Sequence, residues 1–344
     1  MQHKPLVSII IPHYNGETIL IRCLQSLADF TTYPHEILLV DNASTDRSVG
    51  KAQAMFPQIQ VVHSTENYGY AGGCNLGMTA AAGDYFVLLN NDAVVTSGWL
   101  EQLMKFAIAN PEYGALQPKI LSIDNDGWFD YAGAAGGKID VFGFPFTRGR
   151  VFFTLEKDEG QYDAITDLFW ASGTCTLLKR SALETTGPLD IDFFAHMEEI
   201  DLDWRLHLAG FKIGFVPESI VKHNAGSTLS QESPHKVYLN HRNNLEMLLK
   251  NYSGKRLAVV LPVRLIFQFL AMLQTVIKSD LKQTWAITRA MSAVMFRLPR
   301  IWEKRRNVQK MRVRSDAEIA ANMYKGSIVW QYFVKGNKTY ANLK

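Results

Sequence analysis

Acidic side chains crowd into one short stretch of the chain, at Glu198, Glu199, Asp201 and Asp203. The spacing of the apolar residues around them predicts a helix over 196–210. Residues three apart on a helix, such as Glu198 and Asp201, share a face. Like charges this close repel each other unless they serve a cation, a general base or a nearby Arg. The alternative is a first-turn acidic run that only complements the positive end of the helix.

A second polar group follows an apolar run at 84–89 and consists of Asn90, Asn91 and Asp92. A carboxylate in this position can bind a divalent cation, because Mg²⁺ and Mn²⁺ prefer oxygen ligands and often hold diphosphates through one or two carboxylates. The same residue types also form ordinary turns. His223 closes a later apolar run and can supply a metal nitrogen, although a lone His more often has a structural role.

An alternation of strands and helices must position these groups. The apolar patterns predict strands over 6–11, 36–41, 59–63 and 84–89, and helices over 18–30, 45–56, 71–82 and 99–109. Such alternation indicates an α/β fold with a mostly parallel sheet covered on both faces. Ligands of such sheets bind outside the carboxyl ends of the strands, which is where Tyr14, Asn15, Asp41 and Asn67 are expected.

The second half of the chain is less regular. We expect loops and short antiparallel strands over 122–165 and a strand over 168–179. A short helix over 181–186 follows, and two short strands over 212–216 and 219–223 come after the acidic helix. The region from residue 234 onward is predicted to be helical.

Composition and charge distribution exclude some classes of protein. The 344 residues are 47% hydrophobic and 20% charged, which is globular and excludes a disordered or collagen-like chain. Between Lys255 and the C-terminus, 18 Lys and Arg stand against four acidic residues, whereas residues 1–254 hold 18 against 29. This basic tail suggests an anionic membrane surface or another polyanion as partner, and the alternative is a solvated helical face. We find no nucleic-acid-binding motif.

The apolar segment 257–277 contains Pro262, Arg264 and Gln268. It is therefore a poor candidate for a membrane span and fits an interfacial or packed helix better. Cys23, Cys74 and Cys175 form neither a disulfide framework nor a metal-type spacing, which fits a reducing cytoplasm. The N-terminus shows no signal peptide. The chain has neither a G-x-G-x-x-G fingerprint after the first strand nor a P-loop, so ordinary NAD and ATP sites are disfavoured.

Four blocks of sequence, taken together and in order, resemble the family 2 glycosyltransferases of the GT-A fold, most of all their bacterial rhamnosyltransferase-like branch. The blocks are 7–15, 40–46, 67–77 followed by 88–92, and 193–205 followed by 210–213. The resemblance covers roughly residues 5–250 and implies a GT-A domain over 1–250. Residues 251–344 would then be a basic, amphipathic helical region for membrane association or oligomerisation.

The resemblance also implies roles for individual residues. The donor nucleotide would be bound by Pro12, Tyr14, Asn15, Asp41, Asn67, Gly72, Asn75, Asn90 and Asn91. Asp92, with His223, would bind Mg²⁺ or Mn²⁺. Glu199 matches the usual general base, and the neighbouring Glu198 is the alternative. The acceptor would lie near Trp170, Gly173, Asp201, Trp204 and Arg205.

These roles imply an inverting, metal-dependent transferase. It would move a hexose or a deoxyhexose such as rhamnose from a UDP- or dTDP-sugar to a glycan or lipid-linked acceptor in cell-surface polysaccharide synthesis. The expected location is the cytoplasm, with attachment to the inner face of the cell membrane through the C-terminal region as an option. The alternative is a non-catalytic sugar-nucleotide-binding or scaffold protein of the same fold. No nucleic-acid partner is expected, and a homo-oligomer is left open.

Overall fold

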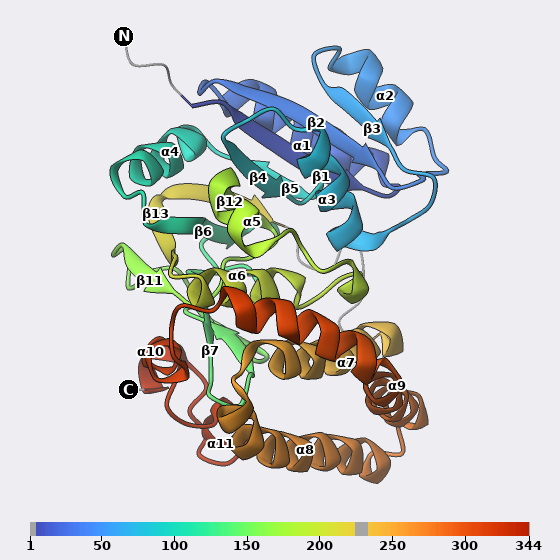
Figure 1. Cartoon of the computed structure of the whole chain (residues 1–344). Coiled ribbons are helices and arrows are strands. Elements are labelled where there is room, and N and C mark those ends of the chain that lie inside the picture. The colour runs from blue at the N-terminus through green and yellow to red at the C-terminus, as the bar shows by residue number, and fades with distance from the viewer. Residues whose placement is uncertain (1–4, 224–232, 344) are drawn as a thin grey trace.

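The computed structural model describes residues 5–223 and 233–343 and centres on a nine-stranded sheet (Figure 1). The strands follow the order β11-β13-β6-β12-β4-β1-β2-β3, and β5 pairs with β13. β1 pairs in parallel with β2 and β4, and β2 pairs in parallel with β3. β12 runs antiparallel between β4 and β6. The strands of this sheet are β1 (Val7–His13), β2 (His35–Asp41), β3 (Gln60–His63), β4 (Tyr85–Leu89), β5 (Ala93–Val95), β6 (Tyr113–Ser122), β11 (Thr166–Leu168), β12 (Cys175–Lys179) and β13 (Lys212–His223).

Helices cover both faces of the sheet because its central strands are apolar on both sides. Every residue of β1 is buried. Ile9 and Ile11 join the core cluster that includes residues of α1 and α4, whereas Ile10 joins the cluster on the opposite face with α3, α5 and α6. The covering helices are α1 (Glu17–Phe30), α2 (Ser48–Met55), α3 (Gly69–Ala80), α4 (Trp99–Ala109), α5 (Arg180–Thr186) and α6 (Glu198–Leu208).

The C-terminal helices form the lower part of the molecule in Figure 1, together with a second, four-stranded sheet. α9 runs beside α7, and α8 lies along the outer edge. Near the C-terminus, the backbone of Tyr324 and Ile328 bonds to Ile139 and Asp140 of the second sheet. The elements of this part are β7 (Gly137–Ile139), β8 (Pro145–Thr147), β9 (Arg150–Val151), β10 (Thr154–Leu155), η1 (Ile191–Phe193), α7 (Pro234–Asn251), α8 (Gly254–Ile277), α9 (Leu281–Met311), α10 (Asp316–Ala321), α11 (Ile328–Phe333) and η2 (Tyr340–Leu343).

The predicted fold class is confirmed as a mixed, mostly parallel α/β sheet with flanking helices and a helical C-terminal region. The predicted strand over 168–179 is wrong in its middle, because the backbone there bonds to side chains: Ala171 donates to Asp203 and Ser172 donates to Gln117. The two strands expected over 212–223 are one strand, β13, whose register shifts between Val216 and Ile220. The predicted domain boundary after residue 250 falls in the last turn of α7 and stays a prediction.

The length and composition of the 257–277 segment do not themselves disfavour a membrane span. Within the described residues, α8 is long and apolar enough to cross a membrane by length and composition. Only 22% of its most apolar window is buried inside the protein. All three cysteines are free and buried.

Two glycines in helices allow a test of the sheet packing, because only one of them lies against a strand. A Cβ at Gly77 of α3 would overlap Ile10 of β1 and lie 3.0 Å from Val40 of β2, whereas one at Gly50 of α2 would meet nothing within 4 Å. We expect Gly77→Ala to lower the free energy of unfolding by about 1–3 kcal/mol through overpacking. Gly50→Ala should raise it by roughly 0.5–1 kcal/mol, because alanine is the better helix former. Urea unfolding of both variants measures this, and a shift of the same sign in both would contradict the packing described.

Candidate functional site

Strand pairing brings Asp92 and His223 together. Asp92 directly precedes β5, and β5 pairs with the end of β13 so that Ala93 lies opposite His223. The His223 Nε2 atom lies 3.0 Å from Asp92 Oδ1, and both side chains are almost fully buried. Asn90 is close by, with its Nδ2 atom 3.4 Å from His223 Nε2. The structure thus brings together these three residues, which the sequence predicted to act as a group.

A further carboxylate, Asp130, holds the other side of the imidazole. Its Oδ1 atom lies 2.9 Å from His223 Nδ1. Burial alone would lower the pKa of His223, but the hydrogen bonds with Asp130 and Asp92 raise it to about 10. Sequence reasoning missed Asp130, because it lies in the irregular segment after β6. Only the pairing of its backbone N–H with Ile120 brings it next to β13.

These donors fit a divalent cation that also binds a phosphorylated ligand. Asp92 offers a carboxylate oxygen, and His223 Nε2, 3.0 Å away, would become a ligand once a bound cation displaces the proton that its raised pKa keeps on the ring. Asp130 fixes the ring orientation as partners of metal-bound histidines do. In the part of the chain that the structure describes, no group of three or more His, Cys, Asp or Glu side chains could hold a metal alone. Phosphate oxygens and water would supply further ligands, as is usual for Mg²⁺ at phosphate sites.

The ends of β1 and β2 form a turn-rich rim. Asn15, with a positive φ of 55°, accepts from the backbone N–H of Thr45 at 2.8 Å. Asp41 accepts from the backbone N–H of Ser44 at 2.8 Å and lies 3.1 Å from the ring of His63. Tyr14 is exposed beside them. The predicted nucleotide contacts at Pro12, Tyr14, Asn15 and Asp41 stay predictions, but these residues do share one edge of the sheet.

His13 connects this rim to the strand end at β4. Its ring nitrogens lie 2.7 Å from Asn91 Nδ2 and 2.7 Å from Ser48 Oγ. Burial lowers the pKa of His13, although the Coulombic influence of Asp46 and Asp41 opposes the shift. Asn91, predicted to contact the donor, is thus fixed by a ring that burial keeps neutral.

The glycine-rich helix α3 is tied to the loop that precedes the acidic helix. Both ends of the Asn75 amide bond to the backbone of Leu189, at 2.8 and 3.1 Å. The N–H of Ala71 donates to the carbonyl of Phe194 at 3.1 Å. Asn67 accepts from the N–H of Gly69 at 2.9 Å, which shapes the start of the helix. Asn67, Gly72 and Asn75 therefore lie where the loop and the strand ends meet, and their predicted donor contacts stay predictions.

Glu198 and Glu199 open α6 as a buried pair of carboxyl groups. Within the described residues, the Oε2 atom of each is buried and has no hydrogen-bond partner. Burial raises the pKa of Glu198 well above its usual range, and the neighbouring Glu199 adds to the shift. Burial also raises the pKa of Glu199, to about 7, while backbone N–H groups oppose the shift. Ionisation of Glu198 is therefore disfavoured, whereas Glu199, with a pKa of about 7, can release or take up a proton near neutral pH.

Contacts connect this carboxyl pair with the strand end at β4. The hydroxyl of Tyr70, whose pKa is raised by burial and by Cys74, Glu198 and Glu199, donates to the carbonyl of Gly173 at 2.5 Å. The carbonyl of the next residue, Thr174, accepts from the N–H of Asn90 at 3.0 Å. Gly173, predicted near the acceptor, thus lies between the two groups.

The loop before α6 has an unusual backbone. Phe194, His196 and Met197 all have positive φ angles, of 64°, 69° and 73°. The amide Nδ2 of Asn243 in α7 donates toward three carbonyls of this loop: Phe193 at 3.0 Å, Ala195 at 2.9 Å and His196 at 2.7 Å. Asn243 was not predicted as a functional residue, because no local pattern in α7 distinguishes it from a surface amide.

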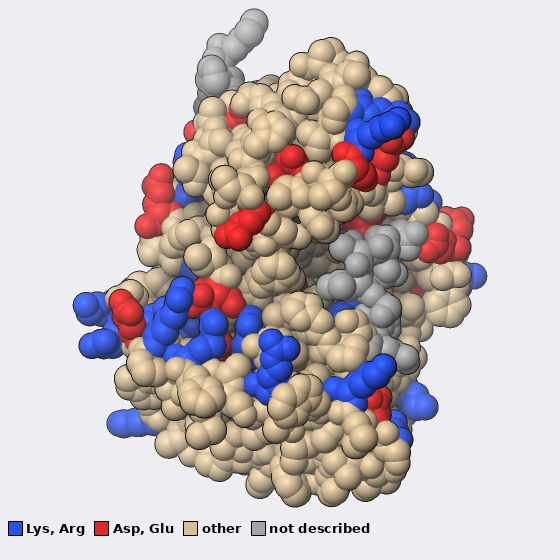
Figure 2. Space-filling view, turned by 90° about the vertical axis from the view of Figure 1, so that its right-hand side faces the viewer, with Lys and Arg blue, Asp and Glu red and all other residues tan. Residues whose placement is uncertain are grey.

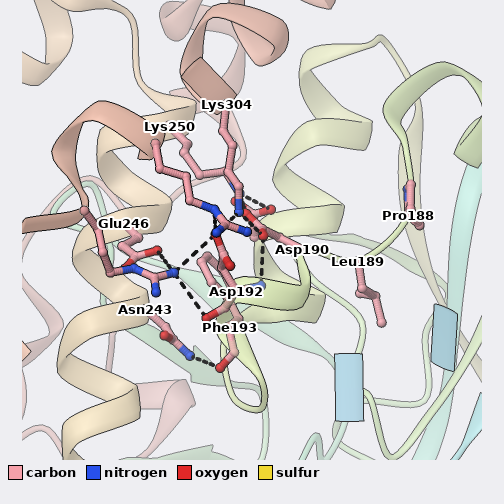
Figure 3. A network of polar contacts seen from close by, with 12 residues as sticks. Pro188, Leu189, Asp190, Asp192, Phe193, Asn243, Glu246, Lys250 and Lys304 are labelled. Carbon is pink, nitrogen blue, oxygen red and sulfur yellow. Dashed lines mark hydrogen bonds and ion pairs between the residues drawn. The ribbon is translucent and has the colours of Figure 1, made fainter. Parts of the chain in front are cut away.

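Ion pairs anchor the same loop to α7 and α9 (Figure 3). Asp190 contacts Lys250 at 2.5 Å and also contacts Lys304. Asp192 contacts Arg300 at 2.5 Å and Arg297 at 3.3 Å, in addition to Lys304. Arg297 also contacts Glu246 of α7 at 2.7 Å. Several cations of the basic tail are therefore used inside the protein.

The structure buries the side chains of four of the residues predicted near the acceptor, and their predicted acceptor contacts stay predictions. Asp201 is fully buried, 3.0 Å from Arg205 and 3.0 Å from Lys250. Trp204 packs edge to face against Phe169 and Tyr252. Arg205 also donates to the carbonyls of residues 186, 187 and 188, and the Trp170 indole donates to the carbonyl of Lys138. These side chains hold α6 in place.

Comparisons with known proteins agree with the geometry. The model for glycosyl transferase family 2 matches residues 8–187. An N-acetylglucosaminyl-diphospho-decaprenol L-rhamnosyltransferase of Mycobacterium tuberculosis is 29% identical over 267 residues, which is 72% of this chain and 86% of that protein.

Solved structures share the fold. TarS of S. aureus in complex with UDP-GlcNAc has a TM-score of 0.56 at 15% identity, covering 96% of this chain and 92% of that one. GalNAc-T7 with UDP, GalNAc and Mn²⁺ has a TM-score of 0.58 at 14% identity, covering 87% of this chain and 58% of that one. At these identities the likeness establishes the fold alone.

The Asp190 ion pairs predict a pH-dependent stability. Burial opposes the shift, but Lys250 and Lys304 lower the pKa of Asp190 below its ordinary value of about 4. Its contribution is therefore fully present above that ordinary pKa and is lost as pH falls below it. We expect Asp190→Asn to lower the free energy of unfolding at pH 7 by about 2 kcal/mol, since it removes one of the two carboxylates that Lys250 and Lys304 each contact.

Urea unfolding at pH 7, 5 and 3 tests this, with Glu184→Gln on the exposed side of α5 as control. The gap between Asp190→Asn and the unsubstituted protein should shrink toward pH 3, while the control stays within about 0.5 kcal/mol at each pH. A gap that is constant with pH would contradict the role of the charge.

Proposed function

This chain belongs to glycosyl transferase family 2, and from this premise we propose that it is an inverting, metal-dependent glycosyltransferase. The proposed reaction moves a hexose or deoxyhexose from a UDP- or dTDP-sugar to a glycan or lipid-linked acceptor. The observation that carries the proposal is the carboxyl pair at the start of α6. One member has a pKa of about 7 and a buried oxygen without a hydrogen-bond partner among the described residues.

The donor's leaving group is a nucleoside diphosphate, which gains negative charge as the bond to the sugar breaks. A Mg²⁺ or Mn²⁺ ion, when bound, supplies charge neutralisation for that group without a proton. Asp92 and His223 are the residues that would hold it, and Asp130 keeps the imidazole in the orientation that presents Nε2 to the ion. The rim at Tyr14, Asn15 and Asp41 would receive the base and ribose.

Glu199 is the proposed general base. A carboxylate with a pKa near the working pH takes a proton from the attacking hydroxyl most efficiently. Burial and the neighbouring Glu199 disfavour ionisation of Glu198, so Glu199 is assigned as the base of the pair. A single displacement on the face opposite the leaving group inverts the anomeric centre, whereas retention would require a second carboxylate positioned as a nucleophile.

The relatives support the choice of substrates. The Mycobacterium tuberculosis relative is by name an L-rhamnosyltransferase acting on N-acetylglucosaminyl-diphospho-decaprenol, which favours a deoxyhexose donor and a lipid-linked acceptor in polysaccharide synthesis. The neighbouring structures of TarS and GalNAc-T7 contain UDP or a UDP-sugar, which favours a uridine or thymidine nucleotide. The alternative, a sugar-nucleotide-binding scaffold of the same fold, predicts binding without turnover.

Two isosteric substitutions separate the roles of the carboxyl pair. Glu199→Gln should lower kcat by about 10²–10⁴-fold, because the amide cannot accept the proton. Glu198→Gln should retain most activity, because an amide has nearly the shape of the protonated acid. Steady-state kinetics of both variants measure this, and nucleotide affinity confirms that each site is intact. A larger loss in Glu198→Gln would exchange the two assignments.

The pH profile gives an independent check on Glu199. Because a base acts in its deprotonated form, kcat/KM should rise with pH through about 7 and level off above it. The residual activity of Glu199→Gln should lack this limb. A flat profile between pH 5 and pH 8 in the unsubstituted protein would rule out a base with this pKa.

The experiment that tests the proposal as a whole is a thermal-shift panel of UDP, dTDP, GDP and CDP, each with Mn²⁺ or EDTA. A ligand at a hundredfold excess over its dissociation constant stabilises the native state by about 2.7 kcal/mol. We expect a shift with UDP or dTDP that needs Mn²⁺ and is lost in Asp92→Asn. No shift with any nucleotide would refute the proposal, and a shift in a protein without turnover would favour the scaffold.

A further inference from the structure

Helix α8 has the reverse polarity of a typical surface helix, because its polar side chains face the protein and its apolar side chains face outward. Its two central polar side chains, Arg264 and Gln268, are buried against the protein. Arg264 donates to Asn244 of α7 at 3.0 Å and to Gln268 at 2.9 Å, and the Gln268 carbonyl lies 2.8 Å from the His241 ring. The polar side of this helix therefore faces inward.

The apolar side of α8 faces outward instead. Ile266 is 60% exposed, Phe269 is 55% exposed and Leu270 is 51% exposed. Exposed apolar residues recur every three or four positions, which is the spacing of one helix face. These residues are Val259, Leu265, Ile266, Phe269, Leu270, Leu273, Val276 and Ile277.

The exposed apolar surface continues past the turn into α9. Leu281 and Trp285 are exposed in its first turns, and Met295 and Phe296 are exposed further along. Monomeric soluble proteins rarely expose a contiguous apolar patch of this extent, and larger patches mark interaction surfaces. We call the exposed apolar residues between Val259 and Trp285 the hairpin face.

The charges around the hairpin face are mostly positive, and Asp280, exposed in the turn between α8 and α9, is the acidic residue among them. α8 contains no acidic residue. Lys278, Lys282 and Arg289 are exposed at the turn and in α9, and none of them forms an ion pair with a described residue. Figure 2 shows an almost uncharged lower surface of the molecule beneath a band of Lys and Arg. An apolar face bordered by cations is complementary to an anionic lipid surface.

We propose that the hairpin face docks on an anionic bilayer, with α8 lying in the interface and not crossing the membrane. Crossing would require α8 to leave α7 and carry Arg264 into hydrocarbon without its partners, although the helix is long enough by composition. A second copy of the chain on this face would bring its own Lys278 and Lys282 next to the same cations. The basic tail as a whole is not the docking element, because Lys304, Arg297 and Arg300 pair with Asp190 and Asp192.

The test is co-sedimentation of the full chain with vesicles of phosphatidylcholine alone or of phosphatidylcholine mixed with phosphatidylglycerol. The variant replaces Ile266, Phe269 and Leu270 by Gln. The control replaces Met55 of α2 and Ile108 of α4 by Gln, which are 48% and 53% exposed on other helices. We expect preferential binding to the anionic vesicles, a loss on the order of tenfold or more in the variant, and no change in the control.

Three outcomes would overturn the proposal. The unsubstituted protein could stay in the supernatant with both vesicles, or the variant could bind as well as the control. Light scattering could show a dimer that the variant loses, which would assign the face to a second copy. Resistance of the bound protein to alkaline carbonate would show a spanning helix. Nucleotide-induced thermal shifts of the same variant, expected unchanged, separate this proposal from the proposed function.

Discussion

Ion pairs between the loop at 188–197 and the C-terminal helices fix the site. Asp190 and Asp192 are held by Lys250 of α7 and by Arg297, Arg300 and Lys304 of α9 (Figure 3). Buried ion pairs add little net stability, because desolvation offsets the attraction, but a partner left alone is costly. The ion pairs therefore favour one conformation of the loop, the one in which Asp190 and Asp192 are both neutralised. Because Glu198 follows this loop directly, the carboxyl pair depends on helices that lie outside the sheet.

The backbone of the loop before α6 is strained, and α7 compensates for this strain. Each residue in a sparsely populated region of φ and ψ costs on the order of 1–3 kcal/mol and persists only where its surroundings over-determine it. Phe194, His196 and Met197 are in such a region, and the Asn243 amide supplies the compensating hydrogen bonds. Met197 is the N-cap of α6, so the strain sets the direction in which the helix starts. The orientation of Glu199 is then determined by α7 and not by the loop's own propensity.

The parts of this structure that the sequence predicts are those whose signals are local. Apolar runs predict β1, β2 and β4 because burial on both faces leaves a continuous pattern, and the polar residues after them follow from the topology of parallel sheets. Asp130 and Asn243 could not be predicted, because each acts through a partner that is distant in sequence. The contacts inside the acidic cluster could not be predicted for the same reason. Asp201 is neutralised by Lys250, 49 residues further along, and no feature of 198–205 indicates that partner.

Three cations of the basic tail, Arg297, Arg300 and Lys304, pair with acidic residues of the body, and this changes what the tail can do. These three cations lie on α9 and pair with the body, whereas the exposed side of α8 is mainly apolar. Helix α7 lies between the loop before Glu198 and helix α8. Asn243 of α7 bonds to the loop, and the adjacent Asn244 bonds to Arg264 of α8. Packed helices lie roughly 8–10 Å apart. If α8 rests on a bilayer, the head group of a lipid-linked acceptor needs to cross only about the thickness of α7 to approach Glu199. Docking and catalysis would then be coupled by position alone, with no conformational change required.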